Sequence, residues 1–475
     1  MPAAANLVED LRRALGAEGV RAEPLDQRLF SKDAGVTRGE VVAVTFPRNA
    51  VQVSQVVLIA ARHGYPIVAR GAGTGLAGGA VPSQPAVLIV TTRMDDVVVD
   101  EANRTAWVGP GVINLDLSRR TASLGLHFAP DPSSQAACTL GGNVACNSGG
   151  PHCLAEGSTV NHVLAVEFVD ARGQILTVGG TAPDPAGLDV RSVVVGSEGT
   201  LGVVTRILVK LTPNPPAVKT MLLAFSKVSD AAATVSEVIA SGIVPAALEM
   251  MDQPMVRAVE NFVHADLPVA AAAVLLAEVN GHVAAVDAEA DVIISVGRRH
   301  GATEVRLAAD ERERLLMWKA RKSAFGAIAQ IAPDYYLHDT VIPRNRLVEA
   351  LEEIYAIARR KDLLVMNVIH AGDGNLHPQL VFDGSVPGQL EIVKSAAVEI
   401  VEMSIRLGGT LSGEHGIGLE KRDLMSLVFS AVDLDAQARL REAFDQDHRF
   451  NPGTVLPAGS RCFDFGRSVA EGAWV

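Results

Sequence analysis

A glycine-rich loop between two predicted strands constrains the fold of this 475-residue chain more than any other feature. The strand Pro66–Ala69 leads into Arg70-Gly-Ala-Gly-Thr-Gly-Leu-Ala-Gly-Gly, and Val87–Thr91 is the next predicted strand. A dinucleotide-binding βαβ unit would need a long helix directly after this loop. Pro82 and Pro85 argue against that helix, because proline lacks the backbone donor and blocks helix continuation. The loop instead predicts a backbone cradle for phosphate, with a glycine-rich surface turn as the alternative.

Further loop segments follow and indicate one extended ligand. Pro130-Asp-Pro-Ser-Ser134 is followed by three glycine-rich segments, Thr139-Leu-Gly-Gly-Asn143, Asn147-Ser-Gly-Gly-Pro151 and Val195-Gly-Ser-Glu-Gly-Thr-Leu-Gly-Val203. Glycine lets the backbone approach a ligand closely, because it has no Cβ. Several such loops are what a large flat cofactor threaded between two subdomains would need.

Charge and composition exclude several classes of function. A net charge of −12 argues against nucleic acid and bare anionic membranes as partners, because both attract basic surfaces. The N-terminus lacks the basic start and apolar core of a signal peptide, and the longest apolar stretch, Val269–Ala277, is too short to span a bilayer. The cysteines (Cys138, Cys146, Cys153 and Cys462) form no CxxC pair and are expected to be reduced thiols. We therefore expect a cytoplasmic protein, or one held at the membrane periphery through a partner.

Composition and periodicity divide the chain into three predicted parts. Residues 1–215 alternate between strands and helices. Three prolines in Leu211–Ala217 mark a linker to a second alternating region, residues 216–411. The last part, residues 412–475, is predicted to be helical as far as Phe450-Asn-Pro-Gly and to complete the active site, with a return to the first part left open.

Two histidines flank a predicted hairpin turn. The strands Leu363–His370 and Leu376–Phe382 are joined by Ala371-Gly-Asp-Gly-Asn375, which is a strong turn signal. If His370 and His377 paired directly, their Cβ atoms would lie about 5 Å apart. Two imidazoles at that spacing can share one divalent ion, and two turn histidines without a ligand are the alternative.

A second polar pair stands in the loop Leu411-Ser-Gly-Glu-His-Gly-Ile-Gly418. The low bulk of this loop argues against a role in core packing. If the segment is extended, Glu414 and His415 point to opposite sides, so that one could face a metal and the other a substrate. A solvated Glu-His dipeptide on the surface is the alternative.

Together these motifs resemble the FAD-binding domain of the vanillyl-alcohol oxidase/p-cresol methylhydroxylase (PCMH) superfamily. The similarity runs from about Val41 to Pro457 and is to the branch of glycolate oxidase catalytic subunits, D-lactate dehydrogenases and D-2-hydroxyglutarate dehydrogenases. It implies an α+β fold, with a two-subdomain PCMH-type FAD-binding domain followed by a C-terminal α+β cap domain of the ferredoxin-like type. It also implies a flavoprotein oxidoreductase that acts on CH–OH donors.

The resemblance implies which residues bind FAD. Arg70 to Leu76 with Gly79 would wrap the pyrophosphate, and Glu198 and Gly202 would lie toward the adenosine. Thr74 fills the region where some relatives attach the flavin through a histidine, so we expect FAD to be non-covalent. The implied set is Arg70, Gly71, Ala72, Gly73, Thr74, Gly75, Leu76, Gly79, Pro130, Asp131, Ser133, Gly141, Gly142, Asn147, Ser148, Gly149, Glu198, Gly202, Val203 and Asn451.

The resemblance also implies a metal-assisted reaction. His370, His377 and Glu414 would bind a divalent metal, zinc with manganese or iron as alternatives, and His415 would be the general base. A cation that holds the substrate carboxylate and hydroxyl lowers the hydroxyl pKa and fixes its orientation. A histidine can then accept a proton while the Cα hydrogen leaves as hydride toward the flavin. The sequence leaves open whether His415 takes the hydroxyl or the Cα proton.

Substrate contacts are predicted in two further segments. Trp318-Lys-Ala-Arg-Lys-Ser-Ala-Phe325 resembles the family helix whose arginine binds the substrate carboxylate, so Arg321 is the candidate. A solvated basic face is the alternative for this helix. The segment Pro333–Pro343 resembles one that reaches the active site, with neighbours at Tyr335, Tyr336 and Asp339. Tyr336 and Gln379 are the further predicted substrate contacts.

Three positions depart from the family pattern. The 2-hydroxyglutarate enzymes carry a lysine at the position of Leu337 and an asparagine at that of Gln379, and the glycolate branch would have an arginine near Gln330. Loss of the lysine argues against a second carboxylate on the substrate. A small D-2-hydroxy acid such as glycolate or D-lactate, or one with an apolar tail, is therefore expected.

Two other functions are compatible with the sequence. One is a metal-free FAD oxidase that uses O2, and the other is a non-catalytic FAD-binding subunit of a larger oxidoreductase complex. The electron acceptor is left open among quinone, cytochrome, an electron-transferring flavoprotein and an iron–sulfur partner. A companion subunit and a homodimer are both compatible with the chain.

Overall fold

The chain folds into two units, each with its own core. A computed structural model describes residues 2–182 and 187–457, so Cys462 lies outside the described residues. Within these ranges, unit 1 comprises residues 2–148, 158–213 and 414–457, and unit 2 comprises residues 149–157 and 214–413. The chain passes between the units at four points, and one of them, between Pro213 and Asn214, lies in the proline-rich segment Leu211–Ala217.

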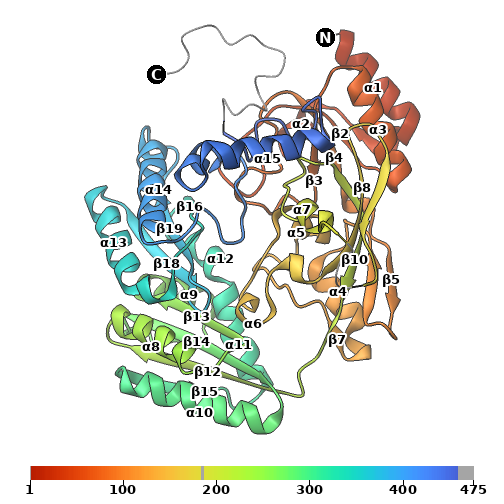
Figure 1. Cartoon of the computed structure of the whole chain (residues 1–475). Coiled ribbons are helices and arrows are strands. Elements are labelled where there is room, and N and C mark those ends of the chain that lie inside the picture. Colours follow the sequence, from red (N-terminus) through yellow and green to blue (C-terminus); the bar gives the residue numbers. More distant parts are fainter. Residues whose placement is uncertain (1, 183–186, 458–475) are drawn as a thin grey trace. The chain divides into compact units, whose positions relative to one another are not determined.

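The first sheet of unit 1 contains the strand that leads into the glycine loop. Its order is β1-β2-β4-β3, in which β2, β4 and β3 are parallel and β1 is antiparallel. The strands are β1 Val20–Arg21, β2 Val41–Thr45, β3 Ile67–Arg70 and β4 Ala86–Val90. Helices α1 (Pro2–Leu15) and α3 (Ala50–Arg62) lie side by side (Figure 1) and share a core with this sheet. No helix lies between the glycine loop and β4, as the two prolines predicted.

The second sheet of unit 1 is antiparallel and has the order β5-β6-β10-β8-β9. Its apolar face packs against the two short helices α4 and α5. The remaining elements are β5 Val97–Asp100, β6 Thr105–Val108, α4 Asn114–Thr121, β7 Leu126–His127, α5 Leu140–Cys146, β8 Val163–Val169, β9 Ile175–Gly179, α7 Val190–Val194, β10 Val203–Lys210 and β11 Thr212–Pro213. Strand β11 pairs with β7 alone.

Unit 2 is built on one eight-stranded antiparallel sheet. Seven strands follow the order β15-β12-β14-β13-β18-β19-β16, and β17 also pairs with β19. The strands are β12 Ala217–Phe225, β13 Ala247–Asp252, β14 Ala273–Gly281, β15 Ala302–Leu307, β16 Asp334–Leu337, β17 Thr340–Val341, β18 Leu364–His370 and β19 Asn375–Phe382. The strands β13 and β18 are neighbours in space although more than a hundred residues separate them in the sequence.

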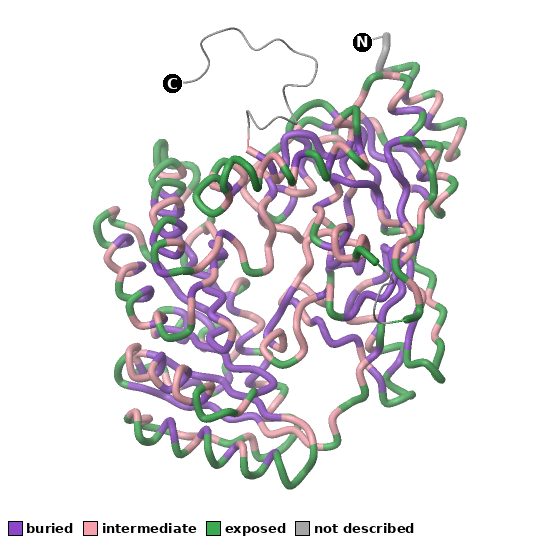
Figure 2. Tube along the Cα trace, viewed as in Figure 1, coloured by how far each residue is buried: buried purple, intermediate pink, exposed green. Residues whose placement is uncertain are grey.

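Helices cover both faces of this sheet. One face buries its apolar residues under α8 (Val228–Ala240), α10 (Val283–Arg299), α13 (Leu347–Arg360) and α14 (Gln389–Arg406). The other face packs against α9 (Gln253–Val263), α11 (Glu311–Lys322) and α12 (Ala324–Ile328), and α6 (Cys153–Glu156) completes the unit. Figure 2 shows buried strands between helices whose outer faces are exposed.

Helix α2 (Pro24–Phe30) lies between β1 and β2, and Pro24 at its first helical position supplies a suitable φ. One sequence expectation was wrong. The segment from residue 412 to 430 is loop and 3-10 helix rather than continuous helix, because glycines at 413, 416 and 418 disfavour helix. Among residues 412–457, α15 (Ala431–Phe444) is the only α-helix. After α15 the chain returns to the first sheet, where Asn451 N donates to Ile67 O at 2.7 Å.

No helix within residues 2–182 and 187–457 combines the length and the apolar character that crossing a membrane requires.

Candidate active site

Arg70 begins the glycine loop at the end of β3 and supplies its cation. Its side chain is 8% exposed, and Nη1 has no hydrogen-bond partner among the described residues. A buried donor without an acceptor is costly unless a ligand supplies the acceptor. Gly73 and Gly78 have φ values of 74° and 79°, which favour glycine. A phosphate oxygen is an acceptor that fits this loop and its guanidinium.

The loop is closely packed on one side and open on the other. A Cβ added to Gly71 would lie 2.2 Å from Thr139 Oγ1, so the loop backbone touches the residue before α5. A Cβ on Gly75 would meet only Asp33 Oδ2 within 4 Å, at 3.8 Å, and one on Gly142 would meet only Thr139 Oγ1, at 3.5 Å. The missing side chains of Gly75 and Gly142 therefore leave the backbone accessible to a ligand.

Asp33 fixes the loop from a segment that the sequence did not single out. Its carboxylate accepts hydrogen bonds from Gly78 N at 3.0 Å and Gly35 N at 2.8 Å. Burial raises the pKa of Asp33 in spite of these two donors. The residue therefore orients the loop backbone rather than acting as a ligand of its own.

Glu198 and Asn451 hold separate loops of unit 1 together. The Glu198 carboxylate accepts from Ile417 N at 2.7 Å and from Gly418 N at 2.8 Å. Asn451 Nδ2 donates to the carbonyl oxygens of Gly79 at 2.7 Å and Glu198 at 2.9 Å. Burial raises the pKa of Glu198 to about 7. Both residues were predicted to contact FAD, and their own contacts fix the backbone of the predicted FAD loop.

The other predicted FAD residues have the following places. Pro130, Asp131 and Ser133 lie in the loop before α5, Gly141 and Gly142 in its first turn, Asn147 and Ser148 directly after it, and Gly202 and Val203 at the start of β10. All of the predicted set except Gly149 belong to unit 1. A Cβ on Gly202 would lie 2.6 Å from Val169 O, so this glycine is also required for packing against β8. Taken with the open glycines and Arg70 Nη1, unit 1 has a donor set that fits FAD.

The two hairpin histidines of unit 2 are diagonal neighbours. Direct pairing was the wrong register, because His370 pairs with Asn375 and His377 pairs with Val368. The side chains still meet, with ring centroids 5.1 Å apart and ring planes at 89°. Residues two positions apart on a strand share one face, so the strand pairing places both rings on the same face of the sheet.

The Nδ1 atoms of both imidazoles face acceptors. His370 Nδ1 lies 2.8 Å and 2.9 Å from the two carboxylate oxygens of Glu249, and His377 Nδ1 lies 3.3 Å from His338 O. If each Nδ1 carries the proton it donates there, each Nε2 keeps its lone pair. Two buried histidines held in that tautomer would supply two of the ligand atoms that a zinc-type cation takes.

Arg321 shares the Glu249 carboxylate with His370. It is 1% exposed and forms an ion pair with Glu249, which is also 1% exposed. Burial acts to raise the pKa of Glu249, but its contacts with Arg321 and His370 outweigh burial and lower the pKa. Arg321 Nε and Nη1 have no hydrogen-bond partner among the described residues. The basic-face alternative is therefore wrong for Arg321, which is buried with donors available to an anion.

Asp339 binds the start of the loop Leu411–Gly418, here called the acidic loop, which carries Glu414 and His415. Ser412 Oγ donates to Asp339 Oδ2, and Gly413 N lies 3.0 Å and 3.1 Å from its carboxylate oxygens. A Cβ on Gly413 would lie 2.3 Å from Asn375 Nδ2, so this backbone touches the end of the histidine hairpin. Glu414 is the next residue, and covalent geometry keeps its Cα about 3.8 Å from that of Gly413.

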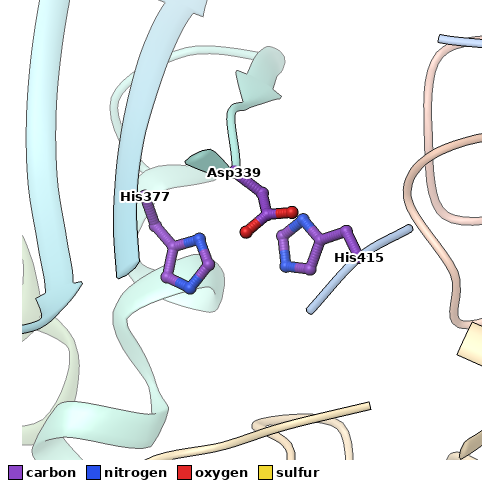
Figure 3. Close-up of side chains that lie close together, drawn as sticks. All are labelled: Asp339, His377 and His415. Atoms are coloured by element: carbon purple, nitrogen blue, oxygen red, sulfur yellow. The ribbon is translucent and has the colours of Figure 1, made fainter. Parts of the chain in front are cut away.

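Figure 3 draws Asp339 and His377 of unit 2 together with His415. The first two are buried and belong to unit 2. Glu414 and His415 belong to unit 1, and chain connectivity through Gly413 is what relates them to the hairpin.

Two of the three residues that depart from the family pattern are neighbours. Leu337 pairs directly with Gln379, and Tyr336 pairs with Leu380. Gln379 shares its sheet face with His377, donates through Nε2 to His377 O at 2.7 Å, and leaves its buried Oε1 without a partner among the described residues. An apolar side chain and a neutral amide thus stand together beside the histidines.

Glu249 is the residue of this region that sequence reasoning missed. It stands in Ala247-Leu-Glu-Met-Met251, where a charged residue interrupts an apolar strand. Acidic side chains are rarely buried unless they are paired, so this interruption is the signal that could have drawn attention to it. The sequence gives no indication of its partners, since His370 is 121 positions away.

Comparison with known families identifies both parts of the chain. The family described as FAD linked oxidases, C-terminal domain, matches residues 214–455. The chain belongs to the FAD-linked oxidase family. A second description, FAD binding domain, matches residues 41–179 of this FAD-linked oxidase, which supports FAD binding by unit 1.

Curated relatives cover most of the FAD-linked oxidase. The glycolate oxidase subunit GlcD of Escherichia coli (strain K12) is 43% identical over 430 residues, which are 90% of this chain and 86% of the relative. GlcD of Bacillus subtilis (strain 168) is 40% identical, with 88% and 90% covered. A D-lactate dehydrogenase of Archaeoglobus fulgidus is 31% identical, with 88% and 92% covered. These relatives confirm the resemblance and show that the chain is an FAD-linked oxidoreductase.

Solved structures confirm the fold class. p-Cresol methylhydroxylase with substrate bound gives a TM-score of 0.80 at 16% identity, with 96% of this chain and 98% of that chain covered. An alkyldihydroxyacetonephosphate synthase gives 0.73 at 16% identity, with 94% and 84% covered. At such identity the likeness concerns the fold alone, which is the α+β PCMH-type arrangement expected from the sequence.

Proposed function

We propose that this enzyme oxidises a small D-2-hydroxy acid, glycolate or D-lactate, to the 2-keto acid, with non-covalent FAD and one divalent metal. His370, His377 and Glu414 would bind the metal, His415 would be the base, and Arg321 would bind the substrate carboxylate. The observation that carries the proposal is the buried histidine pair beside Arg321, each imidazole having Nδ1 next to an acceptor. The names of the relatives support the substrate class.

The proposed residues divide the work between binding and proton transfer. Arg321 Nε and Nη1 are donors suited to a carboxylate, and their burial strengthens the charge-assisted hydrogen bonds. A divalent ion held by the histidine nitrogens would lower the pKa of the substrate hydroxyl. His415 would accept the hydroxyl proton, and bound FAD supplies the acceptor for the two electrons that leave with the Cα hydrogen.

The pair Leu337 and Gln379 supports a short monocarboxylate. Neither side chain carries charge, and the two are directly paired on adjacent strands. A second substrate carboxylate there would be buried without a cation, which costs several kcal/mol in order of magnitude. Tyr336, which the sequence predicted as a further substrate contact, is left out of the proposal. It pairs with Leu380 on the opposite face of the sheet and packs against the core under α13 and α14.

We also propose three functional parts: an FAD domain in residues 1–215, a cap in residues 216–411, and a segment in residues 412–475 that completes the active site. The relatives named as glycolate oxidase subunits support a companion subunit that passes on the electrons. A cytoplasmic location and zinc as the metal belong to the same proposal, with manganese or iron as alternative ions.

Flavin bleaching tests the substrate. Purified enzyme is mixed without oxygen with glycolate, D-lactate, L-lactate or D-2-hydroxyglutarate, and the flavin absorbance is followed. We expect bleaching by glycolate and D-lactate, and much slower bleaching by the other two. Bleaching by L-lactate but not D-lactate would contradict the proposed stereochemistry.

Chelation tests the metal. Dialysis against a strong chelator should abolish turnover with D-lactate while FAD remains bound, and zinc or manganese should restore it. His415→Ala should keep both metal and FAD but lose about 10²–10⁴-fold in turnover, the usual contribution of a general base. Turnover indifferent to the chelator would favour the metal-free oxidase, and unchanged turnover in His415→Ala would reject His415 as the base. A purified wild-type chain that binds FAD but shows no turnover would favour the non-catalytic subunit.

A further inference from the structure

Glu249 lies where the two halves of the proposed substrate site meet. It stands on β13 directly opposite His370 on β18, and both side chains are almost fully buried. Its two carboxylate oxygens lie 2.8 Å and 2.9 Å from His370 Nδ1, and the same carboxylate forms an ion pair with Arg321. Arg321 Nη2 lies 3.4 Å from that Nδ1, so three groups from three elements converge on one point.

We infer that Glu249 is a positioning residue that orients His370 for the metal and Arg321 for the substrate carboxylate. The inference rests on the proposed function. Nδ1–H donated to Glu249 fixes the tautomer of His370 and the rotation of its ring, so that Nε2 is presented as the ligand atom. The ion pair holds the guanidinium by one nitrogen, which leaves Nε and Nη1 available to an anion. The Glu249 carboxylate would therefore fix the positions of the metal and the substrate carboxylate relative to each other.

A second buried glutamate of the same sheet shows what a purely structural carboxylate looks like. Glu278 on β14 is 3% exposed, accepts from Trp318 Nε1 at 2.5 Å and from Thr220 Oγ1, and lies 3.3 Å from Arg314 Nη1. A fourth partner, His152 Nε2, lies 3.4 Å from Glu278 Oε1. None of these four partners is a proposed metal ligand or substrate contact. Glu278 is therefore a matched control for the loss of one buried carboxylate from this sheet.

The amide of glutamine cannot serve both partners of Glu249. Its oxygen can accept either from His370 or from Arg321, and its NH2 group then faces the other donor. In Glu249→Gln we expect metal affinity to fall about 10–100-fold, the range for outer partners of metal-binding histidines. The KM for D-lactate should rise, because Arg321 loses its fixed orientation. FAD content should not change, because all of the proposed FAD residues except Gly149 lie in unit 1.

The experiment compares the wild-type enzyme, Glu249→Gln and Glu278→Gln. Zinc affinity is measured by competition with a chromophoric chelator, FAD content by absorbance, and KM and kcat with D-lactate and a dye acceptor. Glu278→Gln should lower the melting temperature and leave zinc affinity and KM within about twofold of wild type. Wild-type zinc affinity and KM in Glu249→Gln, or equal changes in both variants, would overturn the inference.

A further variant and a ligand control complete the test. If Glu249→Gln gives no folded protein, Glu249→Asp is measured instead, because a carboxylate one methylene shorter withdraws from His370 Nδ1. Wild-type zinc affinity and KM in Glu249→Asp would then overturn the inference. His377→Ala distinguishes the two proposals: zinc binding lost there but retained in Glu249→Gln rejects the role of Glu249 alone. Zinc binding retained in His377→Ala rejects the proposed metal site as well.

Discussion

The glycine loop of unit 1 and the histidine hairpin of unit 2 are two sites built in opposite ways. The glycine loop presents backbone groups, and its glycines matter because they have no side chains. The hairpin presents imidazole nitrogens, and what matters there is the set of groups that fix each ring. Adding an atom should therefore damage the first site, whereas removing one should damage the second.

Loss of a hairpin imidazole should have the largest effect. His377→Ala removes a proposed ligand whose Nδ1 is held by His338 O, so metal content and turnover with D-lactate should both fall more than about 100-fold, beyond the loss of an outer partner. FAD content should be unchanged. Metal analysis and steady-state kinetics measure this, with exposed His282→Ala as the control. A variant that retains both metal and turnover would contradict the proposed role of His377 and, with it, the distinction between the two sites.

Adding one methyl group to the loop should have the next largest effect. In Gly71→Ala the new Cβ would meet Thr139 Oγ1 at 2.2 Å, so the loop must shift at a cost of about 1–3 kcal/mol. FAD content should fall, and zinc content should not. Gly180→Ala is the control, because a Cβ there meets nothing within 4 Å. Equal flavin content in the two variants would show that the loop tolerates a side chain.

The buried carboxylate behind the loop should give a pH dependence. Burial raises the pKa of Glu198 from 4.5 to about 7, so the folded chain keeps a proton that the unfolded chain releases between those values. The free energy of unfolding should therefore fall as pH rises through this window, by at most about 3 kcal/mol at 1.4 kcal/mol per pKa unit. Glu198→Gln should remove that part of the fall.

Melting temperatures of wild type and Glu198→Gln between pH 5 and 8 measure this difference. The two enzymes should be most alike at the acidic end, where Glu198 is protonated, and should diverge as pH rises. Curves that stay parallel across the range would show that Glu198 is ionised throughout.

A hydrogen bond that involves no proposed metal, substrate or FAD residue should have the smallest effect. Tyr355 OH donates to Asp252 Oδ2 at 3.0 Å, on the same strand that carries Glu249. Tyr355→Phe should lower the free energy of unfolding by about 1–2 kcal/mol and leave zinc affinity and FAD content unchanged. Denaturant unfolding and chelator competition measure the two quantities. A fall in zinc affinity would mean that the whole strand, rather than Glu249, positions His370.

The sequence predicted the elements that depend on local rules. Strands β3, β4, β18 and β19 were predicted to within one residue at each end, because apolar spacing and turn residues act over a few positions. The prediction that Pro82 and Pro85 exclude a helix after the glycine loop was confirmed. The continuous helix expected after residue 412 was wrong, since three glycines outweighed the polar and apolar pattern around them.

The candidate site was predicted in part. The histidine pair, the acidic loop and Arg321 came from the residues and from the family resemblance. Neither the residues nor the resemblance gave the strand register. Only direct pairing of His370 with His377 was considered, and the structure has them as diagonal neighbours. Asp33 and Glu249 were missed, because each acts on a partner in a distant segment.

What the sequence determined by itself is chemical identity and local geometry: which residues can bind a phosphate, a cation or a carboxylate, and where the chain turns. What only the tertiary structure decided is which buried acid stands next to which of those groups. Glu249 meets His370 through the pairing of two strands 121 positions apart, and that pairing depends on the packing of the whole sheet rather than on either strand.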